Sequence, residues 1–390
     1  MTQIDSSIGP QGHDQGYHLP TPLRVLLLLL LLWVFLFAIS LMGAAFKVFG
    51  KEFSEALITS TTNPVIGLMI GLLATSIIQS SSGTTSIVVG LVAAGALTVS
   101  NAVPMIMGAN MGTTVTNTIV AMGSMSRRTE FRRAFAGATM HDFFNLLTII
   151  VLFPLEQATH FLEKTATWLS GHLVSSEGLE YHSPIKQIVK PASDALKHLL
   201  VDNLEMANVA AGITMLVISL IALFFALAML TKLMRQVVVS QAEGAFSRNL
   251  ARHGLMGMGL GAIVTVLVQS SSITTSLLVP LIGAGIIPLE GALAVTLGAN
   301  IGTTVTALLA SMAGNSAAVT VAIVHLLFNV TGILIFYPFK PLRRLPILMA
   351  TALANKTSEN RWFALYYMLG LFFLLPLVFV LISRAFGPAS

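Results

Sequence analysis

The sequence predicts an all-α integral membrane protein made of two inverted-topology repeats with re-entrant or discontinuous helices. Hydrophobic residues make up 55% of the 390-residue chain and charged residues only 9%, whereas an average soluble protein contains about 25% charged residues. No charged residue occurs from Ala56 to Ser126, and a charge at mid-bilayer costs roughly 2.5–3.5 kcal/mol. A polar sequence that interrupts the apolar stretches also occurs twice. These three observations predict the fold class.

The repeated sequence has two parts. Residues 79–86 read QSSSGTTS and residues 269–276 read QSSSITTS. Residues 108–116 read GANMGTTVT and residues 298–306 read GANIGTTVT. Both pairs are 190 positions apart, which indicates one duplicated unit. Duplicated halves whose hydrophobic segments carry polar breaks are typical of secondary transporters, in which the site lies where the halves meet.

The first membrane repeat is predicted at 24–163, after a polar, disordered cytoplasmic tail at 1–23. About 20 apolar residues are needed to cross a bilayer as a helix, and broken helices are tolerated only where protein or a water-filled cavity covers the backbone. The expected elements are a span at Val25–Phe46, a broken or re-entrant helix at 64–99, a span at 102–125, a basic loop at 127–133 and helices over about 134–162.

The remainder of the chain is divided by composition. The charged and polar segment 164–205 is expected to be an extracytoplasmic loop. The second membrane repeat is predicted at 206–339, with a span at 206–231 and a basic linker at 232–252. Residues 340–390 are predicted to form a cytoplasmic basic segment and a final transmembrane helix at 362–383.

The basic segments at 127–133, 232–252 and 340–361 set the predicted orientation. Cytoplasmic loops are enriched in Lys and Arg, so these segments are placed in the cytoplasm and the net charge of +5 needs no nucleic-acid partner. The first polar group is then entered from outside and the second from inside. The two repeats are therefore expected to be inverted, with a pseudo-twofold axis in the membrane plane.

The three successive serines of each QSSS sequence can act together only at a helix start or in unwound backbone. Neighbouring residues of an α-helix point about 100° apart. A helix start presents N–H groups and hydroxyls to an anion, reinforced by the helix dipole. The same break exposes neutral oxygen atoms that suit Na⁺. Because neither motif contains Lys or Arg, two breaks meeting at mid-bilayer are expected to hold an oxyanion with Na⁺ offsetting its charge.

Packing is the alternative interpretation for the small residues. Gly108 and Gly112, like Gly298 and Gly302, fit the GxxxG pattern of closely packed membrane helices. Taken singly, any Ser, Thr or Gly of the motifs is more simply a packing residue. Duplication of the whole pattern, with its Gln and Asn residues retained, favours ligand binding for the group.

A further pair of related sequences follows each motif. His141 begins HDFFN and His325 begins HLLFN. The histidines are interpreted as hydrogen-bonded packing residues, and Asn145 and Asn329 as the better ligand candidates. Asp142 has no acidic counterpart in the second repeat, and it is expected to cap a helix or pair with the nearby basic loop.

The paired QSSS sequences resemble those of the type II sodium/phosphate cotransporters, of which the chain is interpreted as a bacterial member. The resemblance extends through 107–121 and 130–139 and covers both repeats. It implies Na⁺-coupled import of inorganic phosphate by alternating access, in a fold similar to the divalent-anion/Na⁺ symporters. It also implies a multi-pass protein of the plasma (inner) membrane with phosphate, Na⁺ and the lipid bilayer as partners. No enzymatic activity, no cofactor other than Na⁺ as coupling ion and no nucleic-acid partner are expected; a homodimer is left open.

The resemblance and the residue chemistry together select the candidate ligands. The candidate phosphate ligands are the family-matched Ser80, Ser81, Ser82, Ser270, Ser271 and Ser272, with Asn110 and Asn300. The candidate Na⁺ ligands are the family-matched Thr303, Thr306 and Asn145, with Gln79, Gln269, Thr113, Thr114 and Asn329. No transition-metal site is expected, and the absence of cysteine excludes disulfides and thiolate ligands.

The chain departs from the family pattern at three places. Ser124 and Arg127 stand where electrogenic animal members have Gln and Asp, Ala299 stands where the family has Ser, and the chain ends at Ser390 without the further span and long tail of animal members. A missing carboxylate removes a strong Na⁺ ligand, and an Arg facing the site would oppose a further cation. These departures predict a transport cycle that moves little net charge.

Three other functions compete with phosphate symport. A Na⁺-coupled symporter of another tetrahedral oxyanion, such as sulfate, would be separated by competition for uptake. An intramembrane serine hydrolase would use a QSSS serine with His141 or His325, but the G-x-S-x-G elbow is absent, and both halves hold the same groups where catalysis needs one asymmetric nucleophile–base pair. A channel is disfavoured because inverted discontinuous helices are typical of alternating access.

Overall fold

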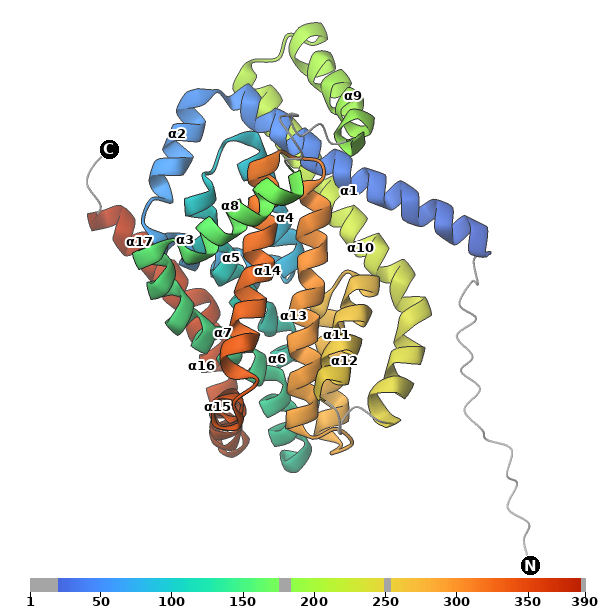
Figure 1. The fold of residues 1–390 in the computed structure, drawn as a ribbon, viewed down its shortest axis with the longest axis vertical. Helices are drawn as coiled ribbons and strands as arrows, with labels where there is room; N and C mark the ends of the chain where they lie inside the picture. Colours follow the sequence, from blue (N-terminus) through green and yellow to red (C-terminus); the bar gives the residue numbers. More distant parts are fainter. Residues whose placement is uncertain (1–19, 175–183, 249–253, 387–390) are drawn as a thin grey trace, which may run out of the picture.

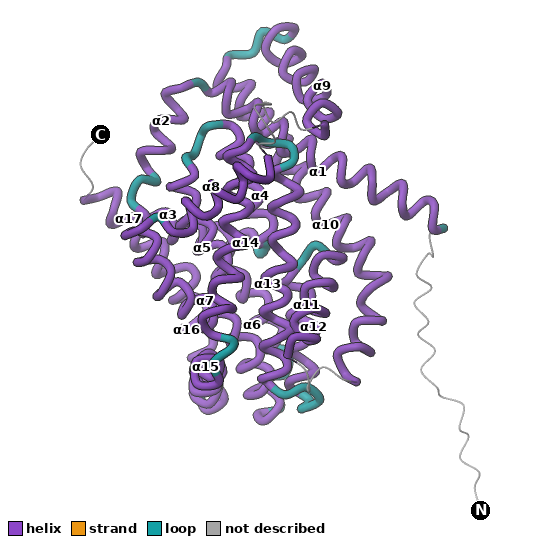
Figure 2. The backbone as a smooth tube through the Cα atoms, in the orientation of Figure 1, coloured by secondary structure: helices purple, strands orange, loops and turns teal. Residues whose placement is uncertain are grey.

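The computed structural model describes residues 20–174, 184–248 and 254–386. Every regular element in these ranges is a helix (Figures 1 and 2). The tail predicted at 1–23 lies almost wholly outside the described residues. The helices are α1 (Thr21–Phe49), α2 (Lys51–Ser60), α3 (Pro64–Ile78), α4 (Ser81–Ala94), α5 (Val99–Met111), α6 (Val115–Met122), α7 (Arg128–Thr159), α8 (Phe161–Val174), α9 (Pro184–His198), α10 (Asn208–Arg248), α11 (Gly254–Val268), α12 (Ser271–Gly283), α13 (Leu289–Ser311), α14 (Ser316–Phe336), α15 (Lys340–Glu359), α16 (Trp362–Leu369) and α17 (Leu375–Phe386).

Six segments of the described residues are long and apolar enough to cross a membrane. They are α1, α7, α13, α14, residues Asn208–Arg235 of α10 and residues Trp362–Ser383 of α16 and α17. Some apolar side chains of these helices, such as Leu26 and Ile221, are largely exposed on the protein surface. In a bilayer these side chains face lipid. The prediction of an all-α, multi-pass membrane protein is confirmed.

Several expected elements differ in detail. The segments 127–133 and 232–252, expected as a basic loop and a basic linker, lie mostly within α7 and α10. Residues 102–125 do not form one uninterrupted span, because α5 ends at Met111 and a 3₁₀ turn at Gly112–Thr114 precedes α6. The turn lies where the chain touches α3: a Cβ on Gly112 would be 2.7 Å from the Leu72 carbonyl oxygen. The segment 164–205, interpreted as a loop, contains most of α8, all of α9 and a π-helical turn at Leu199–Asn203.

Helices α3 and α4 form a re-entrant hairpin. Close glycine contacts show the direction of α3 relative to α5. Gly67, near the start of α3, lies beside Asn101 and Pro104 near the start of α5. Leu72, further along α3, lies beside Gly112 at the end of α5. Helices α3 and α5 therefore run parallel. Since α4 connects the end of α3 back to the start of α5, it must return to the side from which α3 entered. The break at 79–80 is then the tip of a hairpin, as the sequence predicts.

The second repeat builds the same hairpin from α11 and α12. A Cβ on Gly261 would be 2.0 Å from the Val295 carbonyl oxygen, and one on Gly298 would be 1.8 Å from that of Met258. The equivalent contacts of Gly71 and Gly108 in the first repeat measure 2.0 and 1.9 Å. The packing interpretation of the motif glycines is therefore correct: each hairpin arm lies against the following helix so closely that no side chain fits.

The two hairpins open at opposite ends of the molecule. The turn after α4 lies beside the start of α14, where Asn315 Nδ2 donates to the Ala93 carbonyl oxygen at 3.3 Å. The turn after α12 lies beside the start of α7, where a Cβ on Gly285 would be 2.6 Å from Arg133 Nη1. The end of α13 lies beside the end of α4, since a Cβ on Gly314 would be 3.0 Å from the Cβ of Ala93. Because α4 leads directly into α5 there, the equivalent helices α5 and α13 run in opposite directions. The repeats are inverted.

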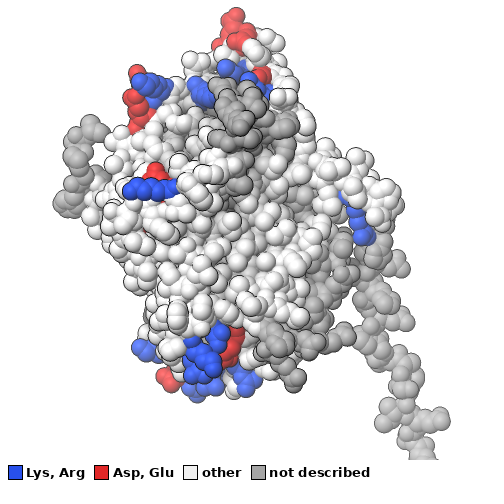
Figure 3. Space-filling model, viewed as in Figure 1, with Lys and Arg blue, Asp and Glu red and all other residues white. Residues whose placement is uncertain are grey.

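The remaining helices tie the repeats together. Helices α1 and α10, which begin the repeats, pack against each other, α8 packs on α14 of the second repeat, and α15 packs on α7 of the first. On the face shown in Figure 3, most charged side chains lie toward the upper and lower ends, and the middle is largely uncharged. The basic helix α15 and the start of α7 share one of these ends and α9 lies at the other (Figure 1).

Candidate functional site

Each hairpin tip is a left-handed residue followed by a serine-capped helix start. Gln79 has φ +60° and Gln269 has φ +55°, a conformation that reverses the chain at the end of a helix. Ser80 Oγ then accepts a hydrogen bond from Gly83 N at 3.0 Å, and Ser270 Oγ accepts one from Ile273 N at 3.4 Å. The predicted helix start is therefore present in both repeats, and Ser80 and Ser270 serve as N-caps.

Equivalent hydrogen bonds hold the two tip glutamines. Thr116 Oγ1 donates to Gln79 Oε1 at 2.8 Å, and Thr306 Oγ1 donates to Gln269 Oε1 at 2.9 Å. The side-chain nitrogen of each glutamine donates to a backbone carbonyl three residues earlier. Both ends of each amide are thus engaged, which fixes the strained tip residue in place.

The remaining four motif serines have no protein partner for their hydroxyls. Ser81, Ser82 and Ser271 are each 4% exposed and Ser272 is 9% exposed. None of these hydroxyls makes a hydrogen bond to another described residue. They lie in the first turns of α4 and α12, where backbone N–H groups also lack intrahelical partners. Each tip therefore gathers unpaired donors at the positive end of a helix, which is the arrangement that binds an anion.

A buried amide and histidine cluster joins the repeats in a twofold manner. His141 Nε2 lies 2.6 Å from Asn300 Oδ1, and His325 Nε2 lies 3.2 Å from Asn110 Oδ1. Each histidine therefore contacts the motif asparagine of the other repeat, which agrees with the interpretation of the histidines as hydrogen-bonded packing residues. Phosphate oxygens would accept from the side-chain nitrogens of Asn110 and Asn300, which in this structure already donate to the Ile106 carbonyl oxygen at 2.9 Å and to Asn145 Oδ1 at 3.2 Å.

Asn145 and Asn329 extend this cluster. Asn145 Nδ2 donates to the Asn110 carbonyl oxygen at 3.1 Å, and Asn329 Nδ2 donates to that of Asn300 at 3.4 Å. The side-chain oxygens differ: Asn145 Oδ1 accepts from Asn300 Nδ2 at 3.2 Å, whereas Asn329 Oδ1 is buried without a partner. A buried unpaired oxygen is unfavourable, so Asn329 Oδ1 has the properties of a cation ligand.

The other threonines chosen as Na⁺ ligands lie around the same cluster. Thr114 Oγ1 is 2.8 Å from His141 Nδ1. The hydroxyls of Thr113 and Thr303 donate to backbone carbonyls of the preceding helical turn, at 3.1 and 3.0 Å, which leaves their oxygen lone pairs free to accept or to bind a cation. The candidate residues thus fall into the two hairpin tips and one central cluster.

The expectation for Asp142 is wrong. Asp142 is 1% exposed, and Oδ2 accepts a hydrogen bond from Tyr367 Oη at 2.8 Å, while Oδ1 has no partner. It pairs with a tyrosine of α16 and not with the basic loop. A residue 225 positions away could not be identified as its partner from local sequence, because only the packing of α16 against α6 and α7 brings the two together.

Two contributing residues were not selected from the sequence. The first is Thr116, which donates a hydrogen bond to Gln79. It belongs to the repeated motif, and its counterpart Thr306 was selected, so the repeat itself could have identified it. Asn117 Oδ1 accepts hydrogen bonds from Thr275 Oγ1 and Ser276 Oγ, both at 3.0 Å, and so joins α6 of the first repeat to the second hairpin. Its counterpart is Ala307, so the repeat comparison contained no signal for it.

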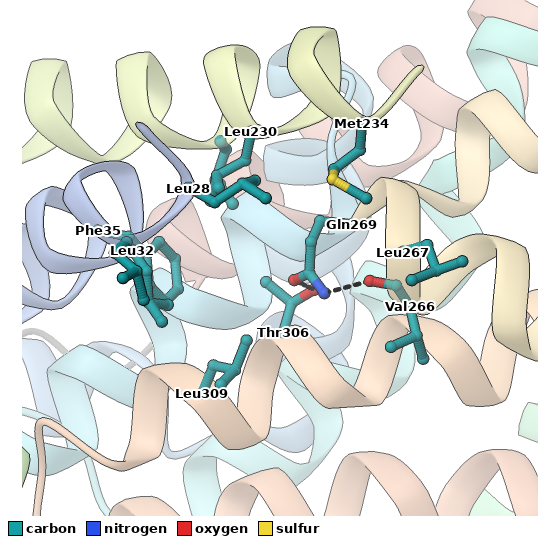
Figure 4. Close-up of a pocket in the computed structure, with 12 residues that line it drawn as sticks. Leu28, Leu32, Phe35, Leu230, Met234, Val266, Leu267, Gln269, Thr306 and Leu309 are labelled. Atoms are coloured by element: carbon teal, nitrogen blue, oxygen red, sulfur yellow. Dashed lines mark hydrogen bonds between the residues drawn. The ribbon is translucent and has the colours of Figure 1, made fainter. Parts of the chain in front are cut away.

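The second tip borders a cavity of about 230 Å³ (Figure 4). The cavity lies between α1, α10, α11 and α13, and Gln269 and Thr306 supply its polar lining among Leu, Phe, Met and Val side chains. At the first tip, by contrast, Phe224 of α10 approaches Gly83 so closely that a Cβ there would be 3.1 Å from its ring. Helix α10 of the α1–α10 pair therefore packs directly on the first tip, whereas a cavity separates the pair from the second tip.

Arg127 lies away from these groups. Its side chain is 73% exposed, and Nη1 is 3.0 Å from both carboxylate oxygens of Glu130. A solvated, paired guanidinium opposes a bound cation weakly. The expected low net charge of transport then depends on Ser124 and Ala299 alone.

Comparison with known proteins agrees with this geometry. A family model described as "Na+/Pi-cotransporter" matches residues 34–163 and 222–374. The chain is 35% identical to sodium-dependent phosphate transport protein 2B of Homo sapiens over 93% of the chain and 65% of that relative. It is 37% identical to sodium-dependent phosphate transport protein 2A of Rattus norvegicus over 93% of the chain and 68% of that relative.

Similar figures hold for sodium-dependent phosphate transport protein 2B of Pongo abelii, at 35% identity over 93% of the chain and 66% of the relative. The chain thus spans about two thirds of the length of these relatives. No solved structure matches it. Since the family model covers both hairpins and most of both repeats, the chain belongs to the Na+/Pi-cotransporter family.

Proposed function

We propose that the chain is a Na⁺-coupled symporter that imports inorganic phosphate by alternating access. The observation that carries this proposal is the pair of inverted hairpin tips, each with two buried serine hydroxyls that lack protein partners at a helix start. The printed names of the relatives, sodium-dependent phosphate transport proteins, support both the anion and the cation.

In this mechanism phosphate binds to the serine hydroxyls and N–H groups of the two tips. Ser80, Ser81 and Ser82 act from the first tip, and their counterparts act from the second. Neither motif contains Lys or Arg, and a divalent anion held in low dielectric needs compensating positive charge. Bound Na⁺ supplies that charge, so phosphate and Na⁺ bind together and neither crosses alone.

Na⁺ is proposed to bind at the neutral oxygens next to the tips. Asn329 Oδ1 is the strongest candidate because it is buried and unpaired. The remaining candidates are Gln79, Gln269, Thr113, Thr114, Thr303, Thr306 and Asn145. Asn110 and Asn300 connect these oxygens to the other repeat. Their side-chain nitrogens bind phosphate in a state where their hydrogen bonds to Ile106 and Asn145 open.

The unequal surroundings of the two tips support alternating access. The α1–α10 pair closes over Gly83 at the first tip and leaves a cavity beside Gln269 at the second. Because the hairpins are inverted equivalents, exchanging the two environments would expose the site to the opposite side. We further propose that the protein resides in the plasma (inner) membrane, with α15 and the start of α7 in the cytoplasm because of their basic residues.

The proposal is tested by uptake into proteoliposomes. Labelled phosphate is supplied outside with an inward Na⁺ gradient, and in parallel with choline in place of Na⁺. We expect accumulation only with Na⁺, and competition by unlabelled phosphate but not by sulfate. Equal uptake with choline would refute coupling, and equal competition by sulfate would favour a general oxyanion symporter.

A further inference from the structure

A second cavity, of about 110 Å³, lies at the end of the molecule that carries α9. It is open to the surface and is bordered by α1, α9, the last residues of α4 and the turn after α13. In contrast to the cavity beside Gln269, much of its lining is polar. The polar residues that line it are Ser40, Lys47, Lys190, Ser193, Asp194 and Lys197.

The three lysines of this cavity are not neutralised by ion pairs. In the described part of the chain, the side chains of Lys47, Lys190, Lys197 and Asp194 form no salt bridge or hydrogen bond. Lysines elsewhere at this end are engaged: Lys51 pairs with Glu55 at 3.3 Å, and Lys164 donates to the Thr159 carbonyl oxygen at 2.8 Å. Three ammonium groups against one carboxylate leave the cavity with a net positive charge.

Helix α9 holds its lysines on a fixed frame. Val189 is completely buried in the core, and Ser193 Oγ lies 2.9 Å from Ser40 Oγ of α1. Lys190 directly follows Val189, and Lys197 lies four residues after Ser193. The two lysines are seven residues apart, so they rise from the same side of the helix two turns apart. Donors on a pre-formed helix bind a ligand with less loss of conformational entropy than donors on a flexible loop.

The cavity also touches the part of the protein that carries the first hairpin. Ala93 is the penultimate residue of α4, and its carbonyl oxygen accepts the hydrogen bond from Asn315 that joins the hairpin to the start of α14. The cavity is therefore bordered on one side by α1 and α9 and on the other by the open end of the first hairpin.

We propose that this cavity binds a phosphate group, either that of inorganic phosphate on its way to the hairpin tips or that of an anionic lipid headgroup. The ammonium groups of Lys47, Lys190 and Lys197 attract the anion and donate hydrogen bonds to it. The hydroxyls of Ser40 and Ser193 serve to join α1 to α9, because Ser193 donates to the Lys190 carbonyl oxygen and Ser40 donates to Ser193. A positive cavity at the mouth of a path raises the local anion concentration and the association rate. The role of this cavity in transport rests on the proposed function, whereas the binding of a phosphate group in the cavity does not.

The first test compares KM for phosphate in proteoliposomes at constant Na⁺ gradient, with choline chloride to vary ionic strength. Lys190→Gln with Lys197→Gln should raise KM roughly fivefold at low ionic strength, since each lost charge weakens attraction a few-fold. The increase should fall below about twofold at 0.5 M salt, where screening acts within about 4 Å. Asp194→Asn should lower KM, which no general loss of folding would do.

Lys51→Gln is the matched control, because Lys51 lies at the same end, is 88% exposed and does not line the cavity. An unchanged KM in the lysine and Asp194 variants, or an equal shift in the control, would overturn the proposal. Membranes of neutral phosphatidylcholine and membranes containing phosphatidylglycerol separate the two sources. A change in KM in both kinds of membrane indicates that the cavity binds free phosphate. A change in KM only in membranes containing phosphatidylglycerol indicates that it binds the lipid headgroup.

A binding readout keeps the inference separate from the proposed function. The purified protein is treated with an amine-acetylating reagent with and without inorganic phosphate, and modification is quantified by mass spectrometry. Phosphate should protect Lys190 and Lys197 but not Lys51. Protection without Na⁺-driven uptake would reject the symport proposal alone, whereas uptake without protection or KM shift would reject the cavity alone.

Discussion

Replacing Gly298 by alanine tests whether the hairpins depend on backbone contact. A Cβ there would lie 1.8 Å from the Met258 carbonyl oxygen and 2.9 Å from Ala262 N. Real Cβ contacts essentially never fall below 3.0 Å, so α11 and α13 would have to separate by about 1.2 Å. The obstacle is backbone and not a flexible side chain, so the neighbour cannot rotate away.

The size of the effect follows from this geometry. Forcing one extra methyl group into a packed core destabilises by about 1–3 kcal/mol, and a backbone obstacle places Gly298→Ala at or above the upper end. Because α11 carries Gln269 and leads into Ser270, the same displacement moves the second tip by about the same distance. Misplacement of a binding group by about 1 Å can reduce rates about 100-fold. We therefore expect both lower thermal stability and a large loss of uptake.

Gly259→Ala is the matched control, on α11, the helix against which Gly298 of α13 packs. Nothing lies within 4 Å of a Cβ at Gly259, and alanine favours a helix by about 1 kcal/mol over glycine. The measurement is the melting temperature of the purified protein, together with Na⁺-driven phosphate uptake in proteoliposomes. A Gly298→Ala protein as stable and active as Gly259→Ala would refute the close-packed hairpin.

Two further predictions concern the buried acid and the inverted topology. Tyr367→Phe should destabilise the protein by about 1–3 kcal/mol, because it removes the 2.8 Å hydrogen bond that buried Asp142 accepts. Tyr366→Phe, at a residue 63% exposed, should not, and equal melting temperatures of the two variants would contradict this. Single cysteines at the equivalent exposed positions Ser100 and Glu290 should react with an impermeant thiol reagent from opposite sides, since the chain has no cysteine of its own. Labelling of both from one side would contradict inversion.

The repeat made the hairpins predictable from sequence. Identical polar breaks 190 positions apart indicated two tips, and three adjacent serines required a helix start. Both features can be seen in the local sequence, although the hydrogen bonds from Thr116 and Thr306 that hold Gln79 and Gln269 come from 37 residues further along the chain. The close glycine contacts were also foreseeable, since GxxxG spacing is a local pattern.

Contacts between distant segments were not predictable in the same way. The pairing of His141 with Asn300 and of His325 with Asn110 depends on how the repeats interlock, and no local pattern encodes it. Asp142 was assigned to the nearest basic loop because sequence distance was the only guide. The lysines of α9 were treated as loop residues, because their common cavity exists only once α9 packs on α1.

The most direct test of a phosphate site shared by the two tips is Na⁺-driven uptake of labelled phosphate by serine-pair variants. Ser81→Ala with Ser82→Ala, and separately Ser271→Ala with Ser272→Ala, should each reduce uptake tenfold or more, since a hydrogen bond to a charged ligand contributes roughly 1.5–3 kcal/mol. Ser86→Ala, which changes a buried hydroxyl without a partner further along α4, should transport normally. Wild-type uptake by either serine-pair variant would show that its hairpin does not bind phosphate and would contradict the shared site.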